Sequence, residues 1–202
     1  MVEQQLRGRD LTDERVLDAM ERVPRELFVP EPLRGRAYDD AALPIGGGQT
    51  ISQPYMVAKI CEALALHGGE HVLDVGSGSG YQAAVLAELA AEVDTIERIP
   101  ELAELARENL AAAGYGRVRV HLGDGTLGVP ERAPFDAVAV AAAAPRLPQT
   151  LYEQLEPRGR LVVPVGRHGI QRLEVIVRSP EGPAVIRSVP CRFVPLVGDE
   201  GF

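Results

Sequence analysis

The stretch from His71 to Tyr81, H-V-L-D-V-G-S-G-S-G-Y, decides the fold of this chain. Its first five residues, 71–75, form a short apolar run that is typical of a buried parallel strand. Glycines follow at positions 76, 78 and 80, and the Ala- and Leu-rich segment 80–90 predicts a helix. The glycines let the backbone turn sharply and approach a ligand, while the helix start offers unpaired N–H groups. This combination predicts a nucleotide-type binding loop.

The chain after this loop alternates strand and helix patterns. Such alternation predicts a parallel sheet joined by right-handed crossovers. Alternating apolar and polar residues near the C-terminus, around a turn at 181–183, predict a late antiparallel hairpin on that α/β sheet. The expected strands are 71–75, 93–97, 118–122, 135–141, 160–165, 171–178, 184–189 and 191–197, and the expected helices are 80–90, 100–112 and 147–155.

The N-terminal third shows separate local patterns but no linker. Because no compositional break divides it from the sheet, we expect one domain over 1–202. Residues 1–69 would form an N-terminal helical extension, and 70–202 would form the sheet and the hairpin. The expected features of the extension are a helix over 13–22 capped by Thr12, an extended proline-rich stretch over 28–32, a glycine loop over 46–48, and a helix over 54–66 that Ser52 can cap.

Composition narrows the possible functions. The 202 residues carry a net charge of −8, which argues against a nucleic-acid substrate because such binders usually need a basic face. Two distant cysteines, Cys61 and Cys191, suggest a reducing compartment and no metal framework. The four histidines lack metal-ligand spacing and are expected at the surface or at strand ends; they are His67, His71, His121 and His168.

Targeting signals are also missing from the sequence pattern. Residues 1–10 are polar and charged, unlike a secretory signal. The longest apolar run, 137–144, is far too short to span a membrane. We therefore expect a cytoplasmic protein without a membrane partner.

The glycine spacing separates two classes of cofactor. A dinucleotide fingerprint, G-x-G-x-x-G, would need its third glycine where Tyr81 stands. The motif present is D-x-G-x-G-x-G with Asp74 at the strand end, and it resembles the first motif of the seven-strand S-adenosylmethionine-dependent methyltransferases. Glu97 ends the next apolar run, where an acid can bind ribose hydroxyls. Asp124-Gly125 follows the third run, where that family places its adenine contact. The alternative is that the glycines form only a tight turn and the acids only cap strands.

Further blocks resemble one family of these enzymes, the protein-L-isoaspartate O-methyltransferases. The likeness covers nearly the whole chain, and its specific part is G-Q-T-I-S-Q-P at 48–54, which a generic methyltransferase has no reason to carry. The resemblance implies a Rossmann-like fold with a seven-stranded, mostly parallel sheet, a C-terminal antiparallel hairpin and an N-terminal helical extension. The matching blocks are V-P-R-E-L-F-V-P at 23–30, L-P-I-G-G-G-Q-T-I-S-Q-P at 43–54, P-F-D-A-V-A-V at 134–140, G-R-L-V-V-P-V-G at 159–166 and R-F-V-P-L-V at 192–197.

The resemblance also implies an activity, the methylation of the free α-carboxylate of L-isoaspartyl residues in damaged proteins and peptides. S-adenosylmethionine would donate the methyl group, the products would be a methyl ester and S-adenosylhomocysteine, and no metal is implied. Ser52 matches the active-site hydroxyl of the family, and 195–197 matches the segment that lines the peptide site. The implied cofactor contacts are Gln49, Thr50, Ile51, Ser52, Asp74, Val75, Gly76, Ser77, Gly78, Gly80, Glu97, Asp124 and Gly125.

The residues suit this chemistry. A carboxylate is already ionised at neutral pH, so the protein needs no strong base and no covalent nucleophile, only positioning and exclusion of water. Ser52 would orient the carboxylate, and its alternative role is to cap the helix that follows. Ala141 and Val57 depart from the family, which often has Thr and sometimes His at these positions. Two aromatic residues, Phe28 and Tyr38, are expected in the core.

The sequence alone is compatible with other functions. One is an S-adenosylmethionine-dependent methyltransferase that acts on another carboxylate, a small molecule or RNA. The others are a non-catalytic cofactor-binding module and a nicotinamide oxidoreductase, which Tyr81 disfavours. We expect a monomer whose partners are isoaspartyl-containing proteins and peptides.

Overall fold

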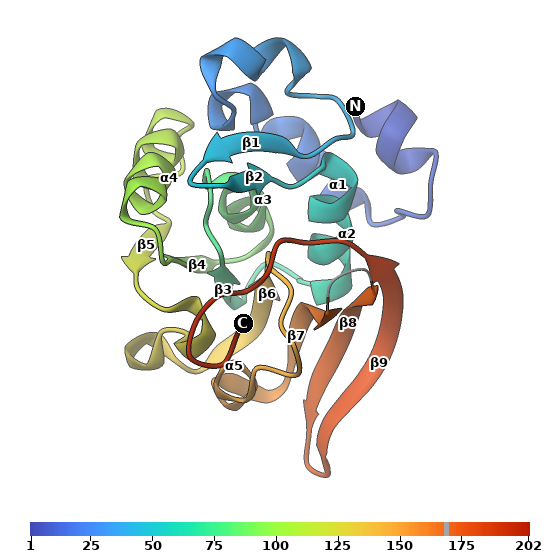
Figure 1. Ribbon diagram of the computed structural model, residues 1–202. Coiled ribbons are helices and arrows are strands. Elements are labelled where there is room, and N and C mark those ends of the chain that lie inside the picture. The colour runs from blue at the N-terminus through green and yellow to red at the C-terminus, as the bar shows by residue number, and fades with distance from the viewer. Residues whose placement is uncertain (168–169) are drawn as a thin grey trace.

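A seven-stranded sheet forms the centre of the computed structural model, which describes residues 1–167 and 170–202 (Figure 1). His168 therefore lies outside the described residues. The strands are β3 (His71–Val75), β4 (Glu92–Glu97), β5 (Arg119–Leu122), β6 (Phe135–Val140), β7 (Leu155–Arg167), β8 (Ile170–Ser179) and β9 (Gly182–Cys191). Their order is β5-β4-β3-β6-β7-β8-β9, parallel from β5 to β7, with β8 antiparallel to both β7 and β9. The predicted α/β fold with a C-terminal hairpin is confirmed.

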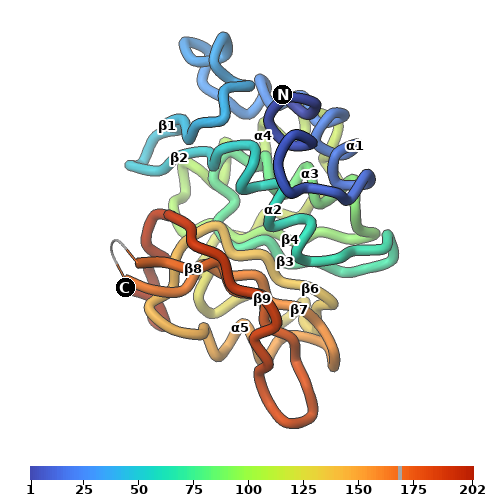
Figure 2. The backbone as a smooth tube through the Cα atoms, turned by 90° about the vertical axis from the view of Figure 1, so that its right-hand side faces the viewer, coloured from blue at the N-terminus to red at the C-terminus, as the bar shows by residue number. Residues whose placement is uncertain are grey.

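Helices cover both faces of this sheet (Figure 2). Successive side chains of a strand point to opposite faces, so Val72 of β3 enters one hydrophobic core and Leu73 enters the other. None of the described helices combines the length and the apolar character needed to cross a bilayer. The helices are α1 (Glu14–Arg22), α2 (Pro54–Leu64), α3 (Tyr81–Leu89) and α4 (Pro100–Ala112) on the first face, and α5 (Gln149–Glu153) on the second.

The N-terminal extension contains elements that sequence patterns did not predict. A two-stranded hairpin, β1 (Leu43–Gly46) and β2 (Gln49–Ile51), lies above the sheet in Figure 1, and the three glycines form its turn with positive φ angles of 101°, 57° and 71°. The extended prediction for 28–32 is confirmed for Val29 and Pro30, whose ψ angles are 138° and 140°. It is wrong for Phe28, which ends one 3-10 turn, and for Glu31 and Pro32, which begin the next, where the fixed φ of proline is tolerated. Short helical turns span Val2–Arg7, Arg25–Phe28, Glu31–Arg36, Gly125–Leu127 and Pro130–Arg132.

Two predicted helix caps are also wrong. Asp13 caps α1 by accepting the Arg15 N–H at 2.9 Å, while the Thr12 N–H donates to Glu62 instead. Gln53 precedes α2 without a side-chain cap, so Ser52 does not cap that helix. The Tyr55 N–H at the second helical position, which such a cap could satisfy, donates to Asp40 Oδ1 at 3.2 Å instead.

The two aromatic residues expected in the core behave differently. Phe28 is 1% exposed, which confirms its core position, and it packs edge-on against the ring of Tyr81. Tyr38 is 42% exposed, so its core prediction is wrong. Its hydroxyl donates to the Glu26 carboxylate, and this polar partner holds the ring at the surface.

The last residues do not form the strand expected over 191–197. After β9 the chain leaves the sheet and passes over the end of β6, where the Ala143 N–H donates to the Val194 carbonyl and the Leu196 N–H donates to the Ala143 carbonyl, both at 2.8 Å. Pro195 cannot donate to a ladder, which limits this pairing to a single bridge. We call residues 192–202 the C-terminal strap; it crosses in front of the sheet in Figure 1.

Gly80 offers a test of the packing behind the glycine loop. Its φ is +92°, and a Cβ atom there would lie 3.1 Å from Leu110 Cγ and 3.3 Å from the Ala106 carbonyl of α4. We expect Gly80→Ala to lower the free energy of unfolding in urea by about 1–3 kcal/mol, through backbone strain and contact with α4 together. Gly114→Ala is the matched control, because its φ is +86° with no atom within 4 Å of a Cβ. If both variants lost the same stability, the contact of the added Cβ with α4 would add nothing to the backbone strain.

Candidate active site

A pocket opens where β3, β4 and β6 end, at the carboxyl edge of the parallel strands. Its empty space is about 840 Å³, open mouth included. The glycine loop forms its floor, β2 and the residues after it form one wall, and the C-terminal strap forms another. Of the predicted cofactor contacts, those that line the pocket are Gln49, Thr50, Ile51, Ser52, Val75, Gly76, Ser77, Gly78, Glu97 and Gly125.

The glycine loop is held against the end of β4. The N–H groups of Gly76 and Ser77 donate to the Ile96 carbonyl at 2.9 and 3.3 Å, and the Ser77 hydroxyl bonds to the Thr95 hydroxyl at 2.7 Å. Gly78 has a φ of +53°, which favours glycine, and a Cβ there would lie 3.1 Å from Ile45. The loop therefore keeps its shape through backbone contacts.

Glu97 connects this loop to the start of α4. Its carboxylate accepts the Gly78 N–H and the Ile99 N–H, each at 3.0 Å, and the residue is 6% exposed. A buried carboxylate with partners only from backbone N–H groups retains lone pairs that can accept further hydrogen bonds. Glu97 is thus placed to accept bonds from hydroxyl groups of a ligand in the pocket.

Asp74, Gly80 and Asp124 are predicted contacts that do not line the pocket. Asp74 is fully buried, accepts bonds from Gln82 Nε2 at 2.7 Å and from the Thr95 hydroxyl at 2.8 Å, and burial raises its pKa to about 6. The structure therefore places Asp74 beneath the glycine loop, where it ties β3 to α3 and β4.

Asp124 is occupied by the C-terminal strap. Its carboxylate accepts the Asp199 N–H at 2.8 Å and both the N–H and the hydroxyl of Thr126, at 2.8 and 2.7 Å. Burial opposes its ionisation, but these donors outweigh burial and hold the pKa of Asp124 below its usual value. Its neighbour Gly125 lines the pocket, and a Cβ there would lie only 2.8 Å from Val75.

A second pocket shares part of the wall of the first. Thr50, Ser52, Ala141, Val194 and Pro195 line both, so Ser52 stands where the two spaces meet. The second pocket is formed mainly by the strap and by the segment from β2 to the start of α2, and its further lining residues are Ala42, Gln53, Met56, Gln171, Cys191, Arg192 and Phe193.

Sequence reasoning did not single out part of the first pocket. Ile96, Arg98 and Ile99 flank Glu97 at a strand end, so the same strand-end argument could have included them. Val194 carried no such signal, because its place depends on the path of the strap. The other lining residues that were not predicted as cofactor contacts are Val57, Ser79, Tyr81, Gln82, Ala141, Ala142, Pro195, Leu196 and Val197. The segment 195–197 was expected in the peptide site; Pro195 lines both pockets, whereas Leu196 and Val197 line the first pocket and not the second.

Comparison with known proteins bears on this site. The family described as "Protein-L-isoaspartate(D-aspartate) O-methyltransferase (PCMT)" matches residues 1–201. The chain belongs to this family. The protein-L-isoaspartate O-methyltransferase 2 of Marinobacter nauticus is 58% identical, and the match covers 100% of this chain and 93% of that protein.

Solved structures of the family share the fold. One protein-L-isoaspartate O-methyltransferase superposes with a TM-score of 0.88 at 29% identity, covering 100% of this chain and 67% of that one. A beta-aspartate methyltransferase (PCMT) of Plasmodium falciparum, solved in complex with S-adenosyl-L-homocysteine, has a TM-score of 0.85 at 27% identity and covers 97% of this chain and 96% of its own. The seven-stranded, Rossmann-like methyltransferase fold is therefore established for this chain.

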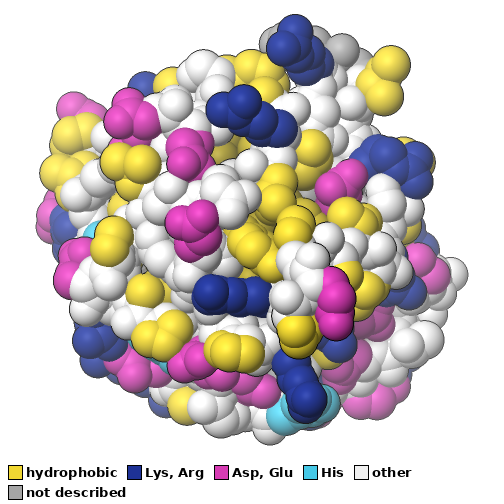
Figure 3. All heavy atoms as spheres, turned by 90° about the horizontal axis from the view of Figure 1, so that it is seen from below, with side chains coloured by type: hydrophobic (Ala, Val, Ile, Leu, Met, Phe, Trp, Pro, Cys, Tyr) yellow, Lys and Arg dark blue, Asp and Glu magenta, His cyan; other side chains and the backbone are white. Residues whose placement is uncertain are grey.

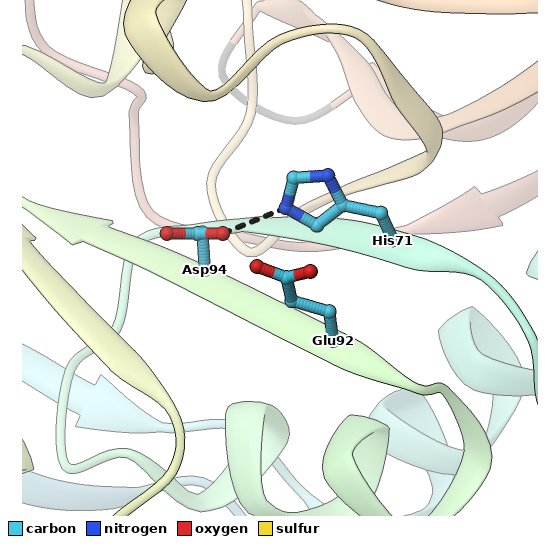
Figure 4. A group of neighbouring side chains, drawn as sticks. All are labelled: His71, Glu92 and Asp94. Carbon is cyan, nitrogen blue, oxygen red and sulfur yellow. Dashed lines mark hydrogen bonds and ion pairs between the residues drawn. The ribbon is translucent and has the colours of Figure 1, made fainter.

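A separate group of charged residues lies near the amino-terminal ends of β3 and β4. Ligand atoms of His71, Glu92 and Asp94 lie within 4.8 Å of one another (Figure 4). Both oxygens of Asp94 already accept histidine N–H groups, from His71 at 2.7 Å and from His121 at 2.6 Å. Two arginines, Arg119 and Arg132, pair with Glu92. Positive groups thus balance the acids, and the cluster is an ion-pair network of the fold.

Asp94 is the central acid of this network, so its replacement should lower the free energy of unfolding. Burial opposes its ionisation, but the two histidines and Arg132 outweigh it and lower the pKa of Asp94. Its contribution is therefore complete at neutral pH and is lost as the pH falls through this lowered value. We expect Asp94→Asn to cost about 1–3 kcal/mol in urea unfolding at neutral pH, and less at about pH 3.

A matched control is Glu104→Gln, which removes an exposed ion pair with Arg107 and should cost about 0–1 kcal/mol. An Asp94→Asn loss as small as this control, or one that grows in acid, would contradict the structural role of the network.

Proposed function

We propose that this protein is a repair enzyme that methylates the free α-carboxylate of L-isoaspartyl residues in damaged proteins and peptides. The methyl donor would be S-adenosylmethionine, and the products a methyl ester and S-adenosylhomocysteine. The observation that carries the proposal is the position of Ser52 in the wall common to both pockets. One pocket would hold the donor, the other the damaged peptide, and the transfer would occur at their junction.

The first pocket suits S-adenosylmethionine on the chemistry of its wall. Glu97 offers acceptor lone pairs for ribose hydroxyls, and its negative charge favours a cationic sulfonium in the same pocket. Apolar side chains of Val75, Ile96 and Ile99 offer a surface for the adenine ring. When bound, the donor supplies a methyl group that its positively charged sulfur activates for displacement.

The protein then has to orient the acceptor and keep water away. An isoaspartyl carboxylate is ionised at neutral pH, so no residue needs to remove a proton from it. Within the described residues the Ser52 hydroxyl forms no hydrogen bond, which leaves it available to donate one to the carboxylate. Fixing two reactants in line can be worth roughly 7–11 kcal/mol, and no covalent enzyme intermediate is required.

The residues behind the wall support this arrangement. We propose that Asp74 and Gly80 shape the glycine loop, and that Asp124 anchors the C-terminal strap over the site. The strap residues Leu196 and Val197 line the donor pocket and would exclude water from it. In this arrangement Asp74, Gly80 and Asp124 do not contact the donor themselves; they hold the glycine loop and the strap, which do.

We propose further that the enzyme works as a cytoplasmic monomer, as one domain over 1–202, without a metal and without nucleic-acid partners. The free thiols of Cys61 and Cys191 suit a reducing compartment. On the face shown in Figure 3, basic and acidic side chains are interspersed among the described residues and do not merge into one basic area. Activity that survives a metal chelator, and an elution volume of a 21.7 kDa particle, would support these points.

The deciding experiment is a methyl-transfer assay with paired peptides. An isoaspartyl peptide and its aspartyl isomer differ only in the position of one carboxylate, so labelling of the first alone would support the proposal. Equal labelling of both, or of neither, would refute it. Transfer to a small carboxylate in place of the peptide would instead indicate a different methyltransferase on the same fold.

A further inference from the structure

Arg25 is a charged side chain in the interior of the N-terminal extension, outside both pocket walls. It is 0% exposed and begins the 3-10 turn Arg25–Phe28. Its Nε donates to the Ala37 carbonyl at 2.7 Å, and its Nη2 donates to the Ser52 carbonyl at 2.8 Å. Its guanidinium carbon lies 4.6 Å from the centre of the Tyr81 ring. One side chain thus joins three segments that are distant in sequence.

The burial of this cation is costly for the fold. Among the residues described, Arg25 Nη1 has no hydrogen-bond acceptor and no carboxylate forms an ion pair with the guanidinium, since Asp40 acts on it only through space. Burial lowers the pKa of Arg25, although a guanidinium stays protonated in proteins. Packed apolar side chains are often at least as stabilising as buried charges. A buried charge without a carboxylate partner is therefore expected mainly where function requires it.

The Ser52 segment needs an external support of this kind. β2 ends at Ile51 and α2 begins at Pro54, so neither a strand ladder nor a helix holds the peptide group of Ser52. The hydrogen bond from Arg25 fixes its carbonyl, and four covalent bonds separate that carbonyl oxygen from the Ser52 hydroxyl. The orientation of the hydroxyl therefore depends on where Arg25 holds the carbonyl.

The same guanidinium contacts the donor side of the site. Tyr81 is the first residue of α3, directly after the glycine loop, and it is one of the residues that line the first pocket. An arginine can stack on an aromatic ring while its planar fork donates in two directions, which lysine cannot do. Arg25 therefore links the segment that would hold the acceptor to the segment that would hold the donor.

We propose that Arg25 is a positioning residue for the methyl transfer, which sets Ser52 relative to the glycine loop through the Ser52 carbonyl and the Tyr81 ring. This inference rests on the proposed function. It also gives a physical role to the V-P-R-E-L-F-V block at 23–29, whose Phe28 packs against the same ring. Arg25 does not touch either reactant and acts only through the groups it holds.

The test compares turnover with cofactor affinity. We expect Arg25→Ala to lower kcat for an isoaspartyl peptide about 10-fold, which does not exceed the loss expected on removing the Ser52 hydroxyl itself, because a displaced group keeps part of its effect. The affinity for S-adenosylhomocysteine, measured by calorimetry, should stay close to that of the unmodified protein. Added methylguanidinium should restore part of the turnover by filling the space left by the side chain. Arg25→Lys should remain slow because a compact ammonium does not reproduce the planar fork whose Nε and Nη2 donate to the two carbonyls.

Arg15→Ala is the matched control, because Arg15 also joins two backbone carbonyls, Leu66 at 2.5 Å and Leu89 at 3.2 Å, away from both pockets. It should lower the melting temperature and leave kcat unchanged. The proposal is overturned if Arg25→Ala keeps normal turnover, loses cofactor affinity in parallel with turnover, or gains nothing from methylguanidinium.

If Arg25→Ala does not fold, the test rests on Arg25→Lys alone. Normal turnover in Arg25→Lys would overturn the proposal, and slow turnover with intact cofactor affinity would support it. The unmodified protein is assayed in parallel with the isoaspartyl peptide and its aspartyl isomer. A failure there would refute the proposed function and would be distinguishable from a failure of the role of Arg25.

Discussion

Replacing Ser52 by alanine should abolish most of the methyl transfer and leave the protein folded and able to bind its cofactor. We expect kcat for an isoaspartyl peptide to fall about 10- to 100-fold, the value of one hydrogen bond to a charged group. Stability should not change, because the Ser52 hydroxyl neither caps α2 nor bonds to any described residue. A coupled assay for S-adenosylhomocysteine release measures the rate, and calorimetry measures the cofactor affinity.

A second serine serves as the control for this variant. Ser188 on β9 bonds to Arg172, neither residue lines either pocket, and Ser188→Ala should leave kcat unchanged. Normal turnover in Ser52→Ala would remove the hydroxyl from the mechanism. A loss of cofactor affinity as large as the loss of turnover would instead place Ser52 in the donor pocket alone.

The Glu97→Gln variant should show the largest effect on cofactor binding. Its carboxylate accepts both the Gly78 and the Ile99 N–H groups. The amide of glutamine keeps only one acceptor and turns an NH₂ group toward one of these donors. We expect the Kd for S-adenosylhomocysteine to rise about 10- to 100-fold, because a charge-assisted bond to the ligand is lost and the loop is less well held.

Titration calorimetry of Glu97→Gln beside Glu101→Gln provides the measurement. Glu101 is an exposed acid in the first turn of α4, four residues further on, and its variant should bind normally. Unchanged affinity in Glu97→Gln would exclude Glu97 from the ligand contacts. Equal weakening in both variants would point to a general loss of negative charge in place of a specific contact.

The sequence predicted elements most reliably where their pattern is local. β3 occupies the predicted 71–75 and α4 occupies the predicted 100–112, because an apolar run before glycines and a proline-initiated amphipathic segment carry their own boundaries. The helix cap at Ser52 was predicted on the same local basis and is wrong, because the carboxylate of Asp40 accepts the Tyr55 N–H that a cap could have satisfied. Local residue preference states what a side chain can do, and the neighbouring chain decides whether that role is needed.

The three acids predicted as cofactor contacts show the same limit of local sequence patterns. Asp74, Glu97 and Asp124 all follow strand patterns, and the sequence treats them alike. In the structure only Glu97 lines the pocket, while Asp74 bonds to Gln82 and Thr95, and Asp124 holds the strap. The partners of Asp74 lie within 21 residues of it, whereas Asp199 lies 75 residues from Asp124. Such distant partners leave no periodic signal around the acid.

What the sequence alone determined is the α/β sheet, the glycine loop and the resemblance that names a family, since these depend on contiguous residues and on fixed spacings. What only the tertiary structure decided is how distant segments meet: the strap over β6, the wall that Ser52 shares between two pockets, and the buried Arg25 that joins Ser52 to Tyr81. The physical reason is that burial and hydrogen bonding are satisfied by whichever groups the folded chain brings together, and those groups need not be neighbours in sequence.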